Sequence, residues 1–434
     1  MSLRRLRLLT AGESHGPGLS GILDGLPAGL RVATAKVDEE LARRQHGYGS
    51  GRRMLIEQDR VTWTAGLRYG RTLGSPLAFS IANRDWESWQ ERMAVEPRAA
   101  ADRPRPITLA RPGHADLAGA IKYDTGDIRD VLERASARST AARVAAGAVC
   151  RQLLGACGVS LWSFVDQLGP VRAFGGAEDT VALVPPDWVA RDRRDPSPLR
   201  CPDPEAEAAM MAEVDAVIEA GDSIGGSFVV VAEGLPVGLG SNGEWDTRLD
   251  AALAAAIMGV QAVKGVGIGL GFGVVSRRGS EVHDEVWPDR PGWQRKTNRA
   301  GGVEGGMSNG AAVTIRAAVK PVATLRRPLD AVDLASGEVH RAHIERSDVA
   351  ILPRAAVVGE GMVALVLADA LLTSLGGDTM GDVHAALRRR RRRSLGPRAG
   401  AAGPPIGGGP VDERISSLPD DAAAAAASVP GTDA

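Results

Sequence analysis

The segment Ala356–Leu375 limits what this chain can fold into more than any other part of the sequence. Its residues are apolar on most faces of a helix, so we expect a helix that is buried rather than amphipathic. Two further helices are predicted at Thr140–Leu154 and Leu249–Val263, where alanine is frequent and helix breakers are few. Alternating apolar runs at Gly226–Val237 and Ala311–Ala318 predict strands.

These helices and strands mix without a strict strand–helix–strand rhythm, which favours the α+β class over a doubly wound sheet. We expect one folded unit over residues 1–387. Residues 95–107 and 180–204 are rich in proline and charge and are predicted as loops. From residue 388 six consecutive arginines lead into a Gly/Pro/Ala-rich stretch, so we expect a disordered tail over residues 388–434.

Charge and cysteine content argue against several functions. The formal net charge of -1 predicts neither a nucleic-acid nor a membrane partner. The arginine run at 388–393 is a candidate for non-specific nucleic-acid contact, but a solvated helix end is the favoured interpretation. Three cysteines without metal spacing indicate a reducing compartment. With no signal-peptide pattern in Met1–Thr10 and no run of about 18 apolar residues, we expect a cytoplasmic protein without a membrane span.

Two histidines beside glycines are the candidate proton-transfer groups. His15 lies within Gly12–Gly16, next to Ser14, and His114 follows a glycine three residues after Arg111. Histidine is the side chain whose ordinary pKa suits proton transfer near neutral pH. A plain turn with a surface histidine, or a polar loop, would explain either string alone.

Two arginine-bearing segments are candidate anion sites. Four arginines flank the glycine-rich residues 47–51, namely Arg43, Arg44, Arg52 and Arg53. Guanidinium groups on flexible backbone suit a multiply anionic ligand, although a solvated basic surface is the commoner outcome. Glu133–Thr140 places arginines and hydroxyls at a helix start, where free N–H groups favour an anion. Helix capping by Ser136 or Ser139 is the alternative.

Two further segments complete the set of candidate site segments. Gly301–Gly310 is a glycine-rich loop that matches neither the P-loop nor the Rossmann fingerprint. Ile344–Asp348 places an acid near an arginine, which either holds a proton-transfer carboxylate ionised or forms an ordinary surface ion pair. Together the segments predict a site for a small polyanion, with two histidines and an acid for proton transfer.

The order of these strings resembles that of the chorismate synthase family. Ten strings match in order between about residues 5 and 380: GESHGP at 12–17, NRDW at 83–86, RPGHAD at 111–116, ERASAR at 133–138, GDSIGG at 221–226, QAVKG at 261–265, TNRAGG at 297–302, GGMSNG at 305–310, KPVAT at 320–324 and ERSD at 345–348. Each string is weak alone, but ten in the right order are specific.

The resemblance implies a lyase of the shikimate pathway, which leads to the aromatic amino acids. Its last step would be the 1,4-anti elimination of phosphate from 5-enolpyruvylshikimate 3-phosphate to give chorismate. The resemblance implies reduced FMN (FMNH2) as cofactor although there is no net redox change, and NADPH as the reductant of that flavin in some members. It also implies a β-α-β sandwich, with helices packed between antiparallel sheets, and a homotetramer.

Roles for individual residues follow from the same resemblance. His15 would protonate the departing phosphate, His114 would protonate or stabilise the reduced flavin, and Asp348 would take part in deprotonation at the flavin nitrogen. The implied substrate-binding positions are Ser14, Arg44, Arg53, Arg111, Arg138 and Arg346. The implied flavin-contacting positions are Arg134, Ala135, Ser136, Gln261, Ala262, Gly305, Lys320, Pro321, Val322, Ala323, Thr324 and Arg346.

Three positions depart from the family pattern. Ser50 stands where the family carries an anion-binding arginine, Ser139 where it carries a glutamate, and Thr125 where a phenylalanine is expected. Losing one charge-assisted contact to a buried phosphate costs about 1.5–3 kcal/mol. Two hypotheses therefore stand, an active lyase and a catalytically impaired paralogue that binds flavin or an anionic metabolite. The change at Ser50 also argues against flavin reduction by the chain itself.

Overall fold

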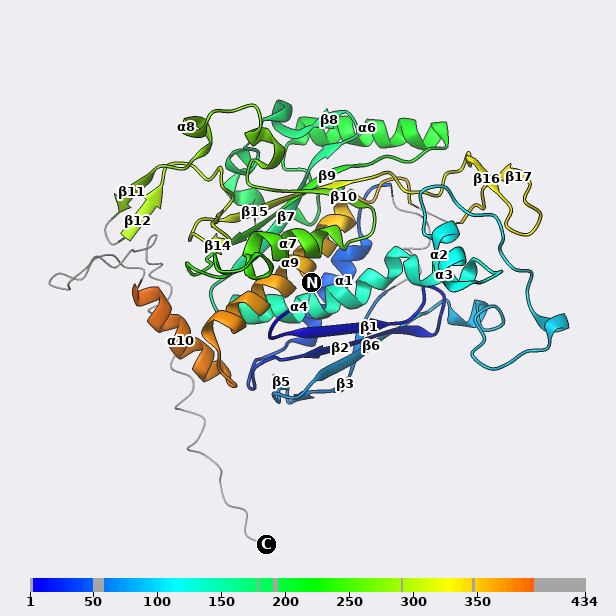
Figure 1. The fold of residues 1–434 in the computed structure, drawn as a ribbon, viewed down its shortest axis with the longest axis horizontal. Coiled ribbons are helices and arrows are strands. Elements are labelled where there is room, and N and C mark those ends of the chain that lie inside the picture. Colours follow the sequence, from blue (N-terminus) through cyan, green and yellow to red (C-terminus); the bar gives the residue numbers. More distant parts are fainter. Residues whose placement is uncertain are drawn as a thin grey trace, which may run out of the picture.

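The structure is a computed structural model that describes residues 3–49, 58–177, 179–189, 194–289, 292–345 and 348–393. Figure 1 shows a layered arrangement, with helices lying between two sheets whose paired strands are antiparallel. One sheet has the strand order β1 (Arg7–Ala11), β2 (Gly18–Asp24), β6 (Leu77–Ala82) and β3 (Val61–Ala65). The other has the order β10 (Val263–Ile268), β15 (Val313–Val319), β9 (Gly226–Glu233), β7 (Ser160–Leu168) and β8 (Val171–Arg172).

Four helices fill the middle layer: α1 (Thr34–Gln45), α4 (Thr140–Ala156), α7 (Leu249–Met258) and α9 (Leu352–Leu375). The other helices are α2 (Asp116–Tyr123), α3 (Arg129–Ala135), α6 (Pro204–Ala220), α8 (Gly279–Val282) and α10 (Met380–Arg393). Short strand pairs are β4 (Leu67–Arg68) with β5 (Arg71–Thr72), β11 (Val286–Asp289) with β12 (Gly292–Arg295), β13 (Val303–Glu304) with β14 (Met307–Ser308), and β16 (Asp330–Val332) with β17 (Val339–Arg341).

The α+β class and the sandwich of helices between antiparallel sheets are confirmed. Each predicted helix and strand exists, but several boundaries differ. The strand predicted over Gly226–Val237 ends at Glu233, the strand predicted from Ala311 begins at Val313, and the helix predicted from Ala356 begins at Leu352. The helix predicted to run to Val263 ends at Met258, because Gly259 follows and Ala262 adopts a left-handed backbone with φ of 69°. Val263 instead begins the edge strand β10.

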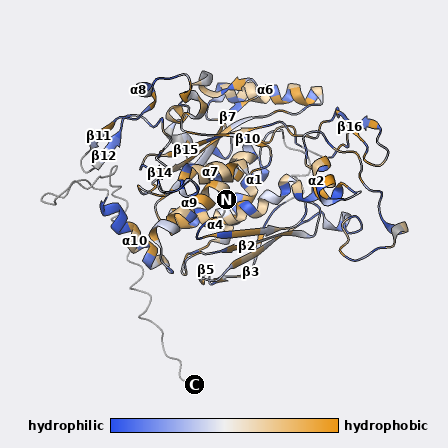
Figure 2. Ribbon diagram, in the orientation of Figure 1, coloured by the Kyte–Doolittle hydropathy of each residue, from blue (hydrophilic) through white to orange (hydrophobic). Residues whose placement is uncertain are grey.

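α9 is the buried helix that its composition predicts. Among the described residues, α9 is the one helix whose length and composition would let it cross a membrane. Glu360 and Asp369 interrupt its apolar residues, so the helix contains no unbroken apolar run of about 18 residues. Of its most apolar window, 89% is buried inside the protein, as in a core helix enclosed by two sheets. Figure 2 shows the apolar character of this middle layer.

α9 crosses α4 at a contact between two glycines. A Cβ placed on Gly147 of α4 would lie 2.5 Å from the Cα of Gly361 in α9. A side chain at position 147 would collide with the Gly361 backbone, so glycine at this position lets the two helices approach so closely. The crossing lies inside one cluster of buried apolar side chains that extends from Leu6 to Leu387. We propose on this basis that the described chain forms a single domain.

Glu360, in the middle of α9, is fully buried and bound by arginines from neighbouring elements. Arg43 of α1 donates from Nη1 and Nη2 at 2.9 and 3.1 Å, and Arg151 of α4 makes a further ion pair. Ser163 of β7 donates at 2.6 Å. Burial raises the pKa of Glu360, but the charges of Arg43 and Arg151 outweigh burial and hold it well below its usual range. The network fixes the end of α1 against α9.

The predicted start of the tail at residue 388 falls inside a helix and is corrected, because α10 extends to Arg393. Arg390 donates to the carbonyl oxygens of Val237 and Gly238 at 3.2 and 3.1 Å, and Arg391 donates to that of Cys157 at 2.9 Å. These contacts place two arginines of the run against the domain. Figure 2 shows the hydrophilic end of α10. Residues 394–434 lie outside the described residues.

Replacing Gly147 by alanine should lower the free energy of unfolding by about 1–3 kcal/mol, because the new methyl group overlaps the backbone of Gly361. Gly155→Ala is the matched control on the same helix, since a Cβ there meets nothing within 4 Å. We expect the control to be neutral or stabilising, as alanine is the better helix former. Urea unfolding of the two variants checks this, and equal stability would contradict the proposed glycine crossing.

Candidate active site

The turn between β1 and β2 presents His15 to the carboxylate of Glu133 in α3. The backbone N–H of Ser14 donates to the Glu133 carbonyl oxygen at 3.0 Å, and that of His15 donates to the Glu133 carboxylate at 2.8 Å. The His15 Nδ1 lies 2.9 Å from the same carboxylate oxygen. Gly12 allows the turn, because it has φ of 110° and a Cβ there would lie 2.4 Å from the Gly18 carbonyl oxygen.

Glu133 fixes the tautomer of His15. Burial raises the pKa of Glu133, but hydrogen bonds from His15 and the charges of His15 and Arg129 outweigh burial and lower it. Arg129 Nη1 donates to the carboxylate at 2.7 Å. The carboxylate therefore stays ionised and accepts the Nδ1 proton, so that proton exchange with a ligand falls to Nε2.

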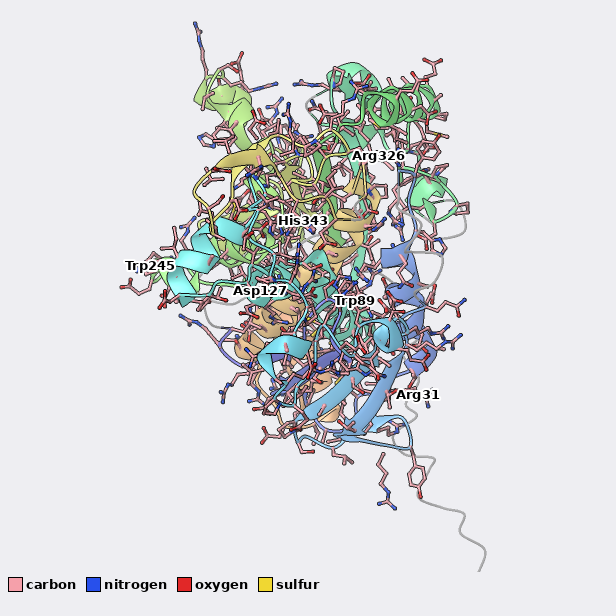
Figure 3. All side chains as sticks on the ribbon, turned by 90° about the vertical axis from the view of Figure 1, so that its right-hand side faces the viewer. Arg31, Trp89, Asp127, Trp245, Arg326 and His343 are labelled. Atoms are coloured by element: carbon pink, nitrogen blue, oxygen red, sulfur yellow. The ribbon has the colours of Figure 1, made fainter. Side chains whose placement is uncertain are left out.

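Trp89 covers one face of the His15 ring, a contact that sequence reasoning missed. The ring centroids are 3.7 Å apart and the planes differ by 22°. Trp89 Nε1 donates to Asp85 at 3.0 Å, and the guanidinium of Arg129 lies 5.2 Å from the indole centroid. Figure 3 shows Trp89 and His343 near the centre of the same face. The stacked indole restricts the imidazole and shields it from water. Asp85, which accepts the hydrogen bond from Trp89, lies in the NRDW string at 83–86. That string was the feature of the sequence that could have pointed to this contact.

The second histidine is held in the same manner. His114 Nδ1 makes a short hydrogen bond to Asp116, whose carboxylate also accepts from Arg111 Nε at 2.8 Å and Nη2 at 3.1 Å. Burial raises the pKa of Asp116, but hydrogen bonds from His114 and Arg111 outweigh it and hold the pKa well below its usual range. All three residues come from the RPGHAD string, but the role of Asp116 was not predicted.

The segment 320–324 packs against this histidine loop. Lys320 Nζ donates to the Gly113 carbonyl oxygen, and Arg111 Nη1 donates to Thr324 Oγ1 at 3.3 Å. Residues that the resemblance assigns to the flavin therefore lie beside His114. Within the segment, the Val322 carbonyl oxygen accepts from Ser223 at 2.7 Å. Lys320 to Thr324 continue directly from β15, which sets their position.

A third group joins Arg44, Asp59 and Arg138. Arg44, in the last turn of α1, donates from Nη2 to Asp59 at 3.0 Å. Arg138 donates from Nη1 to both Asp59 oxygens at 2.5 and 2.6 Å. Arg44 Nη1 also donates to Thr140 Oγ1 at 3.4 Å. All three charged residues are buried. The two arginines were predicted to bind substrate, whereas no sequence pattern singled out Asp59.

The residues between these groups are linked by hydroxyls. Ser136 Oγ donates to Ser14 Oγ at 3.1 Å, which connects α3 to the His15 turn. Ser139 Oγ donates to the Ser136 carbonyl oxygen at 2.9 Å and accepts from Gln261 Nε2 at 2.9 Å. Ser136 also accepts from the Arg138 backbone N–H at 3.3 Å, so the capping interpretation describes a real contact. Ser139 therefore orients the side chain of Gln261.

The remaining predicted site residues include some with clear hydrogen-bond partners and some that lie outside the described residues. Arg134 donates to the carbonyl oxygens of Gly12 and Thr10 at 3.1 and 2.9 Å, which ties Ala135 and its helix to the same turn. Asp348 receives two hydrogen bonds of 2.6 Å from Arg354 in the first turn of α9. Arg354 is thus a partner of Asp348 among the described residues. The predicted residues Arg53 and Arg346, with Ser50 and Arg52, lie outside the described residues.

The ERSD segment reaches the His15 group through Glu345. The Glu345 carboxylate lies 3.0 Å from His343 Nε2 and 3.7 Å from Arg129 Nη2. The hydrogen bond from His343 lowers the pKa of Glu345 despite burial, with help from the charge of Arg129. Arg129 thereby joins Glu345 to the carboxylate that holds His15.

A separate cavity of about 180 Å³ is lined by residues of the five-stranded sheet and neighbouring loops, including Thr180, Thr314 and Arg316. None of the described residues predicted for the site lines it. Arg316 is paired with Asp166 at 2.7 Å. We therefore place the candidate active site at the two histidine groups and not at this cavity.

Two histidines held by buried carboxylates, beside buried arginines in a sandwich of helices between sheets, define an enzyme that moves protons on a small anionic ligand. Comparison with known proteins makes this specific. The profile of the family described as chorismate synthase matches residues 6–372. The chain belongs to the chorismate synthase family, whose members are lyases and whose chemistry implies a flavin cofactor.

Individual relatives agree with this assignment. A chorismate synthase of Desulforudis audaxviator is 52% identical over 396 residues, covering 91% of this chain and 100% of its own. One of Aquifex aeolicus is 49% identical over 385 residues, covering 88% of this chain and 96% of its own. A crystal structure of a chorismate synthase matches with a TM-score of 0.71 and 41% identity, over 89% of this chain and 98% of its own. These matches do not favour the impaired paralogue.

Asp116→Asn should lower the free energy of unfolding at pH 7 by about 1–3 kcal/mol, because Arg111 and His114 lose a charged partner. The folded-state pKa of Asp116 is lowered, so its stabilisation is present above the unfolded value near 3.9 and is lost as the pH falls through the folded value. The gap between wild type and variant should therefore narrow below about pH 4.

Denaturant unfolding at several pH values measures this gap, with Asp246→Asn as a control at an exposed carboxylate. The control should follow the wild type throughout. A gap for Asp116→Asn that stays constant, or that widens on acidification, would contradict the assigned ion pair.

Proposed function

We propose that this chain catalyses the 1,4-anti elimination of phosphate from 5-enolpyruvylshikimate 3-phosphate to give chorismate, with reduced FMN as cofactor. The observation that carries the proposal is the pair of histidines, His15 and His114, each bound through Nδ1 to a buried carboxylate. Both stand in strings shared with the family. The elimination breaks a C–O bond and a C–H bond, so it needs groups that hold and move protons at two places.

The residues assigned to the flavin fit an aromatic, hydrogen-bonding group. Gln261 Oε1 is buried and has no hydrogen-bond partner among the described residues, which leaves an acceptor for a ligand N–H. Next to it Ala262 holds a left-handed backbone, a conformation that is uncommon for a residue with a Cβ. Gly305 faces open space, since a Cβ there would meet nothing within 4 Å.

The positions that would hold FMN are Arg134, Ala135, Ser136, Gln261, Ala262, Gly305, Arg346 and Lys320 to Thr324. Reduced FMN, when bound, supplies the electron-rich partner that a redox-neutral loss of phosphate needs. The rest of the catalysis is binding, orientation and proton transfer by side chains of this chain.

His15 would protonate the departing phosphate from Nε2, since Glu133 accepts the proton of Nδ1. His114 would hold a proton near the flavin, with Asp116 fixing its ring. Asp348 would serve as the carboxylate for deprotonation, held in place by Arg354. Each of these three groups thus has a charged partner that orients it.

Substrate anions would be bound by arginines and one hydroxyl. Arg44 and Arg138 lie together on Asp59, Arg111 lies beside His114, and Ser14 lies beside His15. Arg53 and Arg346 complete the proposed set from outside the described residues. Guanidinium groups suit this role because they pair with carboxylates and phosphates in two-point contacts.

We expect the flavin to be reduced elsewhere. NADPH is the reductant for some members, and the positions associated with it include Arg44 and the residue that is Ser50 here. Serine in place of a second arginine removes one charged contact for the NADPH phosphate.

A homotetramer is proposed from the outer face of the four-stranded sheet. Leu9 and Ile22 are cross-strand partners on β1 and β2 and are 63% and 44% exposed. Exposed apolar side chains on a sheet suit contact with another subunit. A cytoplasmic location is proposed from the thiols, because Cys150, Cys157 and Cys201 are all unpaired and buried, as suits a reducing compartment.

Anaerobic turnover of 5-enolpyruvylshikimate 3-phosphate with dithionite-reduced FMN tests the function, by following chorismate absorbance and phosphate release together. We expect equal amounts of both products. His15→Gln should lower kcat by about 10²–10⁴, because the proton donor is lost. His384→Gln is the control, since its ring contacts a carbonyl oxygen at the end of α4. Wild-type protein that forms neither product would refute the proposal.

Ser139→Ala should weaken FMN binding by about three- to tenfold, because Gln261 loses the hydroxyl that orients it. Fluorescence titration of FMN measures the dissociation constant in the wild type and the variant. Ser197→Ala is a matched control, because Ser197 Oγ donates to Glu207 of α6 and not to an assigned position. Unchanged FMN affinity in Ser139→Ala would contradict the role of Gln261.

A further inference from the structure

Asp59 is the acidic member of the group formed with Arg44 and Arg138, and its position is set by α1. The Asp59 backbone N–H donates to Gln45 Oε1 at 3.4 Å. Two residues later, the Val61 backbone N–H donates to Asp38 Oδ1 at 2.9 Å. The chain entering β3 is thus fastened to α1 at two points. Asp59 does not depend on a ligand to reach its place between the arginines.

Arg44 is also fixed from the opposite side. Its neighbour Arg43 is held by the buried carboxylate of Glu360 in α9. Consecutive residues of α1 therefore point to two different anionic partners. Arg44 Nη1 is further directed by Thr140 at the start of α4. The orientation of this guanidinium is determined by α1, α4 and α9 together.

Charge explains why an acid is needed here. Two guanidinium groups in a buried site repel each other and lose hydration, so they would separate without an anion between them. Asp59 supplies one negative charge against two positive charges, which leaves the group with a net charge of +1 at neutral pH. Burial raises the pKa of Asp59, but Arg44 and Arg138 outweigh burial and lower it. The carboxylate is therefore ionised throughout the working pH range.

We propose that Asp59 is a positioning residue that holds the guanidinium groups of Arg44 and Arg138 side by side, so that together they bind one anionic group of the substrate. Asp59 stays in place when the substrate binds and does not touch the reacting atoms. The identity of the anion rests on the proposed function, whereas the pairing of the two arginines is a property of the structure.

The place of this group in the site supports positioning. Arg138 lies two residues after Ser136, whose hydroxyl contacts Ser14 next to His15. An anion bound by Arg138 therefore lies on the side of the site that carries the proposed proton donor. A carboxylate that merely occupied the anion site would need freedom to leave it, but Asp59 is 5% exposed and its backbone is bound to α1.

Asp59→Asn tests the proposal, because it keeps the shape of the side chain and removes its charge. KM for 5-enolpyruvylshikimate 3-phosphate should rise about ten- to a hundredfold, while kcat changes less than about threefold. The dissociation constant of the substrate, titrated into flavin-free protein, should rise by the same factor as KM. Affinity for FMN should stay at the wild-type value, which separates positioning from a general loss of structure.

Asp166→Asn is the matched control. Asp166 is 6% exposed and pairs with Arg316 at 2.7 Å on the five-stranded sheet, so its burial matches that of Asp59, while its arginine partner is more exposed. The control should lose a similar amount of thermal stability but keep KM and kcat. A rise of KM in both variants would attribute the effect of Asp59 to stability alone and overturn the proposal.

A double-mutant cycle asks whether Asp59 acts through the arginines. In an Arg138→Gln background, Asp59→Asn should raise KM by no more than about threefold, since one of its two partners is already lost. Full additivity of the two effects would overturn the proposal. A lower KM in Asp59→Asn would also overturn it, because it would mean that the carboxylate competes with the substrate.

If Asp59→Asn does not fold, Asp59→Glu replaces it as the test of the proposal. Its charge is kept but the extra methylene displaces both guanidinium groups, so KM should rise and an unchanged KM would overturn the proposal.

Failure of the proposed function has a different outcome, namely wild-type protein that neither binds nor converts the substrate. Inorganic phosphate titrated into wild-type and Asp59→Asn protein then tests the pairing, with weaker binding to the variant expected and equal binding overturning it.

Discussion

The approach of α4 to α9 through Gly147 and Gly361 sets the geometry on which the site depends. α4 begins at Thr140, directly after the segment that carries Ser136 and Arg138. α9 begins at Leu352, and its first turn carries the arginine that holds Asp348. Ser136, Arg138 and Asp348 therefore lie next to the first turns of two central helices. A change in the separation of these helices would move the two sides of the site relative to each other.

Glu360 fixes how the helices are oriented in this packing. A buried ion pair contributes little net stability, since both charges lose water, and apolar residues of similar size are often as stable. Its effect is in geometry, because Arg43, Arg151 and Ser163 each come from a different element and converge on one carboxylate. We interpret the network as a device that fixes the rotation of α1. Arg44 on that helix is then presented toward Asp59 and away from the apolar core.

Sequence reasoning identified the strings of the site but not the contacts between them. His15, His114 and their arginines were predicted because glycine beside histidine is a local pattern. Asp59, Trp89 and the role of Glu133 were missed, since each acts on a residue distant in the chain. The end of α7 was misjudged because alanine and valine continue past Gly259 while the backbone turns at Ala262. Fold class was accessible because the predicted helices and strands mix without a strict strand–helix–strand rhythm, and because ten strings match one family in order.

The buried thiols have a practical consequence. Burial raises the pKa of Cys157 to about 11 and that of Cys201 to about 12, and it raises the pKa of Cys150 further still. Thiols that stay protonated and enclosed react slowly with alkylating reagents and mild oxidants. A single cysteine introduced at an exposed position would then take up a maleimide dye selectively. Ligand-induced movement of the surface loops can be followed by fluorescence in the native sequence background, without first replacing any natural cysteine.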